Sequence, residues 1–328
     1  MRAIADRLAG APISWGVCEV PGWGWQLDTA TVLSQMHEVG LVATELGPDG
    51  FLPDEPQARA KTLADRGLRA VGGFVPVVLH DPAVDPVPQI ERVLAGFAAA
   101  DASTLVLAAV TAAAGYDVPR PVLDDTGWQV LLTNLDRLAV LASRAGITAT
   151  LHPHMGTMVE TPDDVGRVLA GSGIGLCLDT GHLLIGGSDP VAVATEHAGR
   201  IRHTHLKDVD ASWARRVRSG EVTYTDAVRR GMYRPLGQGD LDIAAIVAAL
   251  ERAGYDGWYV LEQDTILAGP PGPGGHPAPG GSDPMADARA SIEHLKAVAL
   301  TATVLQDPAL EDPALENVPF MGTVQGPL

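Results

Sequence analysis

Short apolar runs alternate along the chain with longer amphipathic runs, and this pattern predicts alternating strands and helices. The fourth apolar run is nearly continuous, Thr104-Leu-Val-Leu-Ala-Ala-Val110, as in a strand buried on both faces of a parallel sheet. Eight strands are predicted at residues 11–16, 43–47, within 69–80, 104–110, 147–152, 174–182, 201–208 and 257–264.

The helices predicted between these strands carry recognisable start and stop signals. Thr161-Pro162 and Asp189-Pro190 each place a capping side chain before a proline at the first helical position. Gly40, Gly67 and Gly146 follow the predicted ends of three helices. Helices are expected at about residues 28–39, 55–66, 88–100, 124–144, from 162, from 190, 243–253 and 284–300.

Eight strand-then-helix units without hairpin signals predict an α/β protein with a parallel sheet, and eight such units close into a (β/α)8 TIM barrel. A doubly wound open sheet is the alternative, but Ser14-Trp15-Gly16-Val17 stands where its glycine fingerprint is expected. We expect one barrel domain over residues 1–302, with an Arg- and aromatic-rich insertion at about 209–234 and a Gly/Pro-rich loop at about 269–281. Residues 303–328 are expected to form a loosely held tail.

Composition restricts the partners of this protein. The 23 Lys and Arg against 40 Asp and Glu give a net charge of −17, which argues against nucleic acid or an anionic membrane. Cys18 and Cys177 do not make a disulfide framework. No signal-peptide core precedes residue 16 and no apolar run is long enough to span a membrane, so we expect a cytoplasmic protein. Homo-oligomerisation remains open.

Chemistry-bearing residues gather at the predicted strand ends. In Ile201–Asp208, His203 and His205 lie two residues apart and so share one face of a strand. Taken alone, this stretch is equally well explained as a solvated strand end, but the neighbouring strands also end in polar residues. These residues are Glu45, His80, His152 with His154, Asp179 with His182, and Glu262 with Asp264.

Strands five to eight each deliver an imidazole or a carboxylate at a similar depth, so that the donors can converge. Mixed nitrogen and carboxylate donors suit Mn, Co, Zn or Fe, whereas an all-carboxylate set would indicate Mg or Ca. The predicted metal ligands are His152, Asp179, His205 and Glu262.

Several phrases of the sequence resemble the xylose-isomerase-like TIM barrels, the sugar phosphate isomerase/epimerase superfamily, over about residues 11–300. Asp179-Thr-Gly-His182 and His203-Thr-His205-Leu-Lys-Asp208 are typical of the superfamily. Within the superfamily, the sequence resembles the inosose dehydratase branch more closely. The phrases that point to it are Pro12-Ile-Ser-Trp-Gly16, Thr44-Glu-Leu-Gly47, His152-Pro-His-Met-Gly-Thr157, His205-Leu-Lys-Asp208 and Glu262-Gln-Asp264.

The resemblance implies that the superfamily's metal-binding positions fall at the four residues named above. Most members carry Glu where this chain has His152, and the epimerases and isomerases shuttle a proton between two metal-bound glutamates. This departure favours a one-base elimination over symmetric two-base chemistry. A second departure is the Gly/Pro-rich insertion between Glu262-Gln-Asp264 and Asp283-Pro284, which lies on the active face and bears on substrate size.

The expected reaction is dehydration of a cyclic polyol ketone, such as 2-keto-myo-inositol, through a metal-stabilised enediolate, with manganese favoured. Glu262 or His154 would take the α-proton, and Lys207 or His182 would protonate the leaving hydroxyl. Glu45 would orient a ligand histidine through its second nitrogen. The substrate contacts expected in addition are Trp15, Glu45, His80, His154, His182, Lys207, Arg215 and Tyr233, although ordinary packing is the better explanation of the aromatic residues among them.

Three alternatives remain open from the sequence. One is a sugar or inosose isomerase or epimerase on the same barrel. Another is a lyase that acts on 3-keto-glycosides and expels an aglycone, with the loop near Gly269 making room for it. The last is a non-enzymatic sugar-binding or regulatory protein, which would bind no metal.

Overall fold

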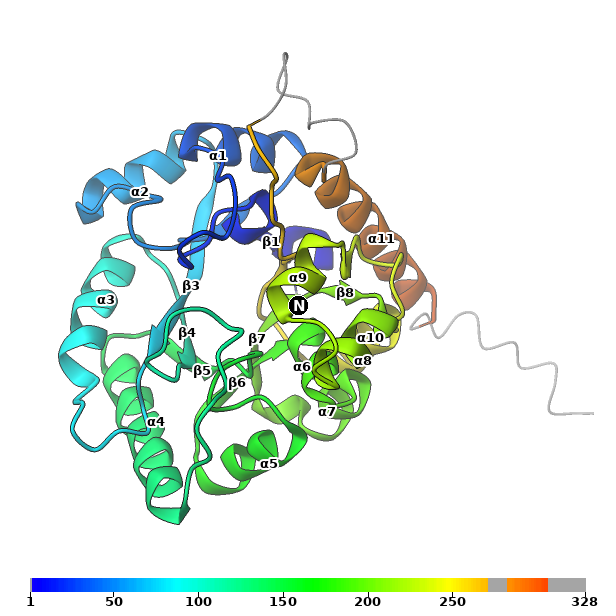
Figure 1. Cartoon of the computed structure of the whole chain (residues 1–328). Helices are drawn as coiled ribbons and strands as arrows, with labels where there is room; N and C mark the ends of the chain where they lie inside the picture. The colour runs from blue at the N-terminus through cyan, green and yellow to red at the C-terminus, as the bar shows by residue number, and fades with distance from the viewer. Residues whose placement is uncertain (1, 271–281, 306–328) are drawn as a thin grey trace, which may run out of the picture.

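The structure, a computed structural model, describes residues 2–270 and 282–305, and these form a closed barrel of eight parallel strands ringed by helices (Figure 1). The strand order around the barrel is β1–β10–β7–β6–β5–β4–β3–β2. The predicted TIM barrel is therefore confirmed. The barrel strands are β1 (Leu8–Gly10), β2 (Ala43–Glu45), β3 (Arg69–Val77), β4 (Thr104–Ala109), β5 (Thr148–Leu151), β6 (Gly175–Asp179), β7 (Ile201–Leu206) and β10 (Tyr259–Leu261).

The outer helices begin where the capping signals predict. Thr161 and Asp164 form a capping box at the start of α5, and the Asp189 side chain accepts the backbone N–H groups that open α7. Each helix buries one stripe against the sheet. The outer helices are α1 (Thr29–Glu38), α2 (Pro56–Ala64), α3 (Val87–Ala99), α4 (Asp125–Arg144), α5 (Pro162–Gly171), α7 (Pro190–Glu196), α10 (Ile243–Arg252) and α11 (Pro284–Leu305).

The prediction of the first strand at residues 11–16 is wrong. Pro12–Trp15 form a 3-10 helix, and the strand is the preceding segment, Leu8–Gly10. The reason lies at its two ends: Pro12 has no N–H to donate to a ladder, and Gly16 adopts φ +79°, which turns the chain. A three-residue strand that follows a short helix gives too little alternation to be recognised.

Two other boundaries move polar residues from strands into the segments that follow them. β6 ends at Asp179, and helix α6 (Thr180–Gly186) starts at once, so His182 lies on a helical first turn. β10 ends at Leu261, so Glu262 and Asp264 extend from the loop beyond it. Both changes keep these side chains at the carboxyl end of the barrel, where active sites of this fold lie.

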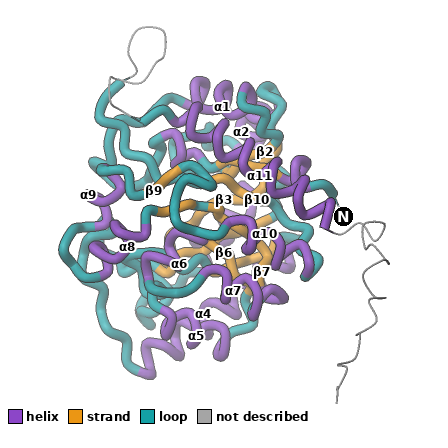
Figure 2. Tube along the Cα trace, turned by 90° about the vertical axis from the view of Figure 1, so that its right-hand side faces the viewer, coloured by secondary structure: helices purple, strands orange, loops and turns teal. Residues whose placement is uncertain are grey.

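The predicted insertion folds into a compact unit over that end of the barrel. It contains β8 (Asp208–Val209), α8 (Ala211–Arg218), α9 (Tyr224–Arg229) and β9 (Tyr233–Arg234), with β8 and β9 paired antiparallel. Figure 2 shows α8 and α9 at the end of the barrel opposite the N-terminus. The antiparallel pair closes the insertion at its base, an arrangement that no hairpin signal indicates.

Most of the predicted Gly/Pro-rich loop and C-terminal tail, residues 271–281 and 306–328, lies outside the described residues. Within the described part of the chain, no helix combines the length and the hydropathy that crossing a bilayer demands. Both cysteines carry free thiols and are buried.

Candidate active site

The four predicted metal ligands come together at the carboxyl end of the barrel. His152 Nε2 lies 3.1 Å from Asp179 Oδ2, and His205 Nδ1 lies 3.6 Å from the same oxygen. His205 Nδ1 is also 2.8 Å from Glu262 Oε2. Asp179 and His205 are direct partners in the β6–β7 register, which fixes them side by side. Asp179, His205 and Glu262 thus converge, and His152 joins them through its contact with Asp179.

The environment of His205 fits a cation. Its Nε2 donates to Glu45 Oε1 at 2.9 Å, and its Nδ1 lies opposite the Asp179 and Glu262 carboxylates. Burial would lower the pKa of His205, but Cys177, Glu262 and Glu45 around the ring raise that pKa well above its usual value. The space between Nδ1 and the two carboxylates therefore favours a positive charge, which a metal ion would supply in place of the Nδ1 proton. Asp179, His205 and Glu262 each offer an atom within 4.8 Å of the others, the span that one metal ion requires.

Glu45 lies behind His205, on the far side of the imidazole from the carboxylates. The same Glu45 oxygen accepts from His203 Nε2 at 2.8 Å. Burial alone would raise the pKa of the Glu45 carboxyl, but the adjoining imidazoles outweigh that effect and hold the pKa well below its usual range. A buried carboxylate that fixes a histidine through its second nitrogen is the usual support of a metal-binding imidazole.

Lys207 balances the negative charge of the site. Its buried ammonium lies 2.9 Å from Glu262 Oε1 and 3.5 Å from Asp179 Oδ2, and it donates a short hydrogen bond to Asp264. Burial would lower the pKa of Lys207, but these three carboxylates raise it well above its usual value. For Asp179, burial acts to raise the pKa, and Lys207 and His182 together reverse the shift to well below the usual range.

Aromatic and imidazole rings line one side of the site. His154 packs against His182, with ring centroids 3.7 Å apart, and against Tyr116 at 4.3 Å. His154 Nδ1 lies 2.7 Å from the Met155 carbonyl oxygen, which can only accept, so the ring proton is on Nδ1 and Nε2 carries the lone pair. Burial lowers the pKa of His154 well below its usual value, which keeps the ring neutral.

Sequence reasoning left two residues of the site without a role. Asp264 accepts from Lys207 and from the Tyr224 hydroxyl, and Tyr224 also lies 3.0 Å from the Tyr233 hydroxyl. Asp264 could have been assigned from its spacing, because it stands two residues after Glu262. Tyr224 could not, because it reaches the site from α9 through a turn of the insertion that no local pattern predicts.

The remaining predicted contacts lie in different surroundings. Tyr233 is buried, with its ring 5.2 Å from the Lys207 ammonium. Trp15 packs in the core and donates from Nε1 to Gln35 at 2.9 Å. His80 is half-buried beyond β3, and Arg215 is exposed on α8. The lining of the cavity of about 610 Å³ at this end of the barrel does not include Trp15, His80, His182, Lys207, Arg215 or Tyr233, and their contact with substrate stays a prediction.

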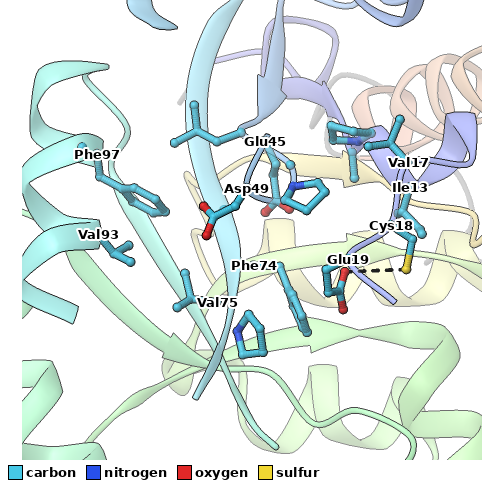
Figure 3. Close-up of a pocket in the computed structure, with 18 of the residues that line it drawn as sticks. Ile13, Val17, Cys18, Glu19, Glu45, Asp49, Phe74, Val75, Val93 and Phe97 are labelled. Atoms are coloured by element: carbon cyan, nitrogen blue, oxygen red, sulfur yellow. Dashed lines mark hydrogen bonds between the residues drawn. The ribbon is translucent and has the colours of Figure 1, made fainter. Parts of the chain in front are cut away.

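A cavity of about 610 Å³ opens from this site toward α2 and α3. Its polar end is lined by Glu45, His154, Glu262 and Asp264. Figure 3 shows Glu45 between the segment that carries Ile13, Val17, Cys18 and Glu19 on one side and the α3 side chains Val93 and Phe97 on the other. The cavity is thus a passage from solvent to the carboxylates that face His205.

Comparison with known proteins places this chain in a family. The profile of the xylose isomerase-like TIM barrel matches residues 33–298. An inosose dehydratase of Geobacillus kaustophilus is 32% identical over 283 residues, which covers 80% of this chain and 90% of the relative. Among solved structures, L-ribulose 3-epimerase superposes with a TM-score of 0.65 at 17% identity, and the match covers 94% of this chain and 99% of the epimerase. The IolI protein with a bound zinc atom superposes with a TM-score of 0.61 at 13% identity, and the match covers 91% of this chain and 96% of IolI. The strand order, the position of the site and the matched profile agree, and the chain belongs to the xylose isomerase-like TIM barrel family.

Proposed function

We propose that this protein is a metal-dependent lyase that dehydrates a keto-inositol such as 2-keto-myo-inositol. The observation that carries the proposal is the convergence of Asp179, His205 and Glu262, with His152 in contact with Asp179, beside an open cavity that Glu262 lines. Inosose dehydratases at 29–32% identity over about 80% of this chain support the substrate class. The net charge of −17 agrees with a small neutral substrate rather than nucleic acid.

The four residues would hold Mn, Co, Zn or Fe, with manganese favoured for a mixed nitrogen and oxygen donor set. When bound, such a cation polarises the substrate carbonyl and stabilises the negative charge that follows loss of the α-proton. Cys177 lies close to His152 and His205 as well, but burial raises the pKa of its thiol to about 11. We therefore keep the thiol outside the ligand set.

Geometry favours His154 over Glu262 as the base that removes the α-proton. Both residues line the cavity. Both Glu262 oxygens are engaged, with Lys207 and with His205, whereas the Nε2 lone pair of His154 is left free by the tautomer that Met155 fixes. A base must present an unengaged lone pair to the carbon acid, and His154 does so.

Lys207 is better placed than His182 to protonate the leaving hydroxyl. An ammonium can only donate, so the 3.2 Å contact from Lys207 to His182 Nε2 leaves no proton on that nitrogen. The carbon–oxygen bond then breaks as the hydroxyl takes a proton from Lys207 and leaves as water. Asp264, held by Tyr224, keeps the ammonium beside the site, and solvent restores the two proton positions.

The test combines a metal determination with a product assay. The purified protein should contain close to one equivalent of a divalent transition metal, and the loaded protein should convert inosose to an α-hydroxy enone, the enol form of a 1,2-dione, which absorbs in the ultraviolet. His205→Ala should lose both the metal and the product, whereas the matched control His37→Ala, at an exposed position of α1, should keep both. A loaded protein that leaves inosose unchanged contradicts the proposal.

An isomerase or epimerase is the second candidate, because Glu262 and His154 both reach the cavity and two bases suffice to move a proton between neighbouring carbons. Proton NMR of the products in deuterated water separates the two reactions. A dehydratase releases water and forms the α-hydroxy enone or its 1,2-dione tautomer. An isomerase or epimerase incorporates deuterium at carbon without loss of water.

A further inference from the structure

The cavity continues beyond the polar end into an apolar compartment, which we call the side chamber and define by Phe74, Val75, Val93 and Phe97. Phe74 and Val75 come from β3, and Val93 and Phe97 from α3. Figure 3 shows Val93 and Phe97 extending from α3 into the space above Val75. Prolines 48, 56 and 76 complete its lining. The side chamber is therefore walled by rings and branched side chains, whereas the metal-facing end is walled by carboxylates and imidazoles.

The side chamber is continuous with the site through Phe74. The Phe74 ring stands edge-on to His152, with centroids 5.7 Å apart, and lies 5.7 Å from the ring of His154. One aromatic side chain thus borders both a predicted metal ligand and the predicted base. A substituent on a bound ring would pass directly from the reacting carbons onto Phe74.

The volume of the cavity is larger than the volume that one polyol ring would occupy. A volume of about 610 Å³ falls in the range of about 300–1,000 Å³ found for pockets that enclose drug-sized ligands. Gly73 contributes to this space, because it has no side chain to press against the Phe97 ring beside it. A Cβ at position 73 would lie 3.0 Å from the tip of the Phe97 ring, so any other residue would press on the chamber wall.

The charges around the side chamber do not favour an anion. Glu19, Asp49, Asp54, Arg59 and Arg92 also line the cavity, and all five are exposed or only half-buried. Three carboxylates against two guanidinium groups leave no net positive charge on the solvent side of the cavity to attract an anion. An apolar ring with a polar outer edge matches walls that are apolar inside and charged at the surface.

We propose that the side chamber binds an aryl substituent carried by the ring of the substrate, so that the protein accepts aryl-substituted cyclic polyol ketones. The inference rests on the proposed function for the position of the polyol ring. A flat ring fits between Phe74, Val93 and Phe97, since aromatic rings gain from offset and edge contacts in addition to apolar burial.

Binding to the manganese-loaded protein tests the side chamber. The probes are myo-inositol, each of its mono-O-benzyl ethers, and a mono-O-glucosyl derivative, measured by isothermal titration calorimetry. We expect at least one benzyl ether to bind about tenfold or more tightly than myo-inositol, because its ring leaves water for an apolar compartment. The glucosyl derivative should gain less than twofold.

Two variants of α3 locate the effect. Ala95→Trp fills the chamber from a lining position that is itself exposed, and Val93→Asp places a charge in its wall. Both should remove the benzyl advantage and leave the affinity for myo-inositol unchanged. Ala98→Trp is the matched control, because Ala98 is exposed on the same helix and does not line the cavity.

The proposal is overturned if no benzyl ether gains affinity, if the gain survives both chamber variants, or if the glucosyl derivative gains instead. Inosose turnover, measured on the same preparations, reports the proposed function separately. Failure to dehydrate inosose contradicts the proposed function, whereas the side chamber is judged only by the difference between benzyl ether and parent polyol.

Discussion

The support of His205 by Glu45 yields a graded prediction for metal affinity. One Glu45 oxygen accepts from both His203 and His205, at 2.8 and 2.9 Å, and the carboxylate is buried. In Glu45→Gln the amide oxygen can still accept both bonds, so only the charge is lost. Charge-assisted hydrogen bonds are about twice as strong as neutral ones, so the bond to His205 weakens by about 1 kcal/mol. We expect Glu45→Gln to raise the Kd for Mn²⁺ about fivefold.

Glu45→Ala removes the acceptor completely and should raise the Kd further. Loss of a residue that supports a metal ligand typically weakens metal binding by about 10–100-fold, and we expect Glu45→Ala to lie near the upper end of that range. Competition with a fluorescent chelator at pH 7.5 measures both constants without a substrate. Glu91→Gln, an exposed change on α3, serves as the control and should bind Mn²⁺ like the wild type.

The Mn²⁺ affinities of the Glu45 and His205 variants, compared with that of the wild type, test the role of Glu45. If Glu45→Gln and Glu45→Ala bind Mn²⁺ as tightly as the wild type while His205→Ala does not, Glu45 has no part in orienting the imidazole. If His205→Ala also binds like the wild type, the ligand set itself is wrong. Circular dichroism of each variant separates a lost site from a lost fold.

Three further predictions concern the rest of the molecule. Tyr224→Phe removes the hydroxyl that Asp264 accepts and should lower kcat about tenfold with little change in KM, as steady-state kinetics can measure. Arg7→Met strips Glu251 of its buried partner at 2.6 Å and should cost about 3–5 kcal/mol in urea unfolding, whereas a loss below 1 kcal/mol would contradict a structural role. Burial acts to raise the pKa of Asp164, but hydrogen bonds hold that pKa below its usual value. The ionised carboxylate therefore adds to the free energy of unfolding above the unfolded pKa of about 3.9, and this contribution is lost as pH falls through the folded pKa. Asp164→Asn should make the free energy of unfolding fall less steeply in this acid range.

The sequence predicts the barrel well, because each of its signals is local. Thr161-Pro162 and Asp189-Pro190 open helices by capping chemistry that needs only neighbouring residues, and the buried strand at 104–109 is apolar throughout. Where the signal is short, prediction fails. Leu8–Gly10 forms a strand because β10 and β2 pair with it on either side, and nothing within those three residues indicates that pairing.

The same distinction applies to the site. The sequence allows the grouping of His152, Asp179, His205 and Glu262, because the carboxyl ends of the strands lie at the same end of a parallel barrel. The topology of the fold therefore predicts that these side chains lie near one another before any distance between them is known. Tyr224 and Tyr116 obey no such rule. They reach the site from segments whose paths depend on packing between distant parts of the chain, such as the short hydrogen bond from Tyr116 to Glu19.

The presence of an imidazole and not a carboxylate at position 152 has a consequence for the charge of the site. In a ligand set of two imidazoles and two carboxylates, Asp179 and Glu262 bring two negative charges, which one divalent cation cancels. Lys207 is then left to balance Asp264, with which it shares a short hydrogen bond. A third carboxylate at position 152 would leave the buried site with an excess negative charge and would hold the Lys207 proton more tightly. The histidine thus limits the negative charge around the ammonium, and His152→Glu should increase the Kd of Mn²⁺ less than it decreases kcat.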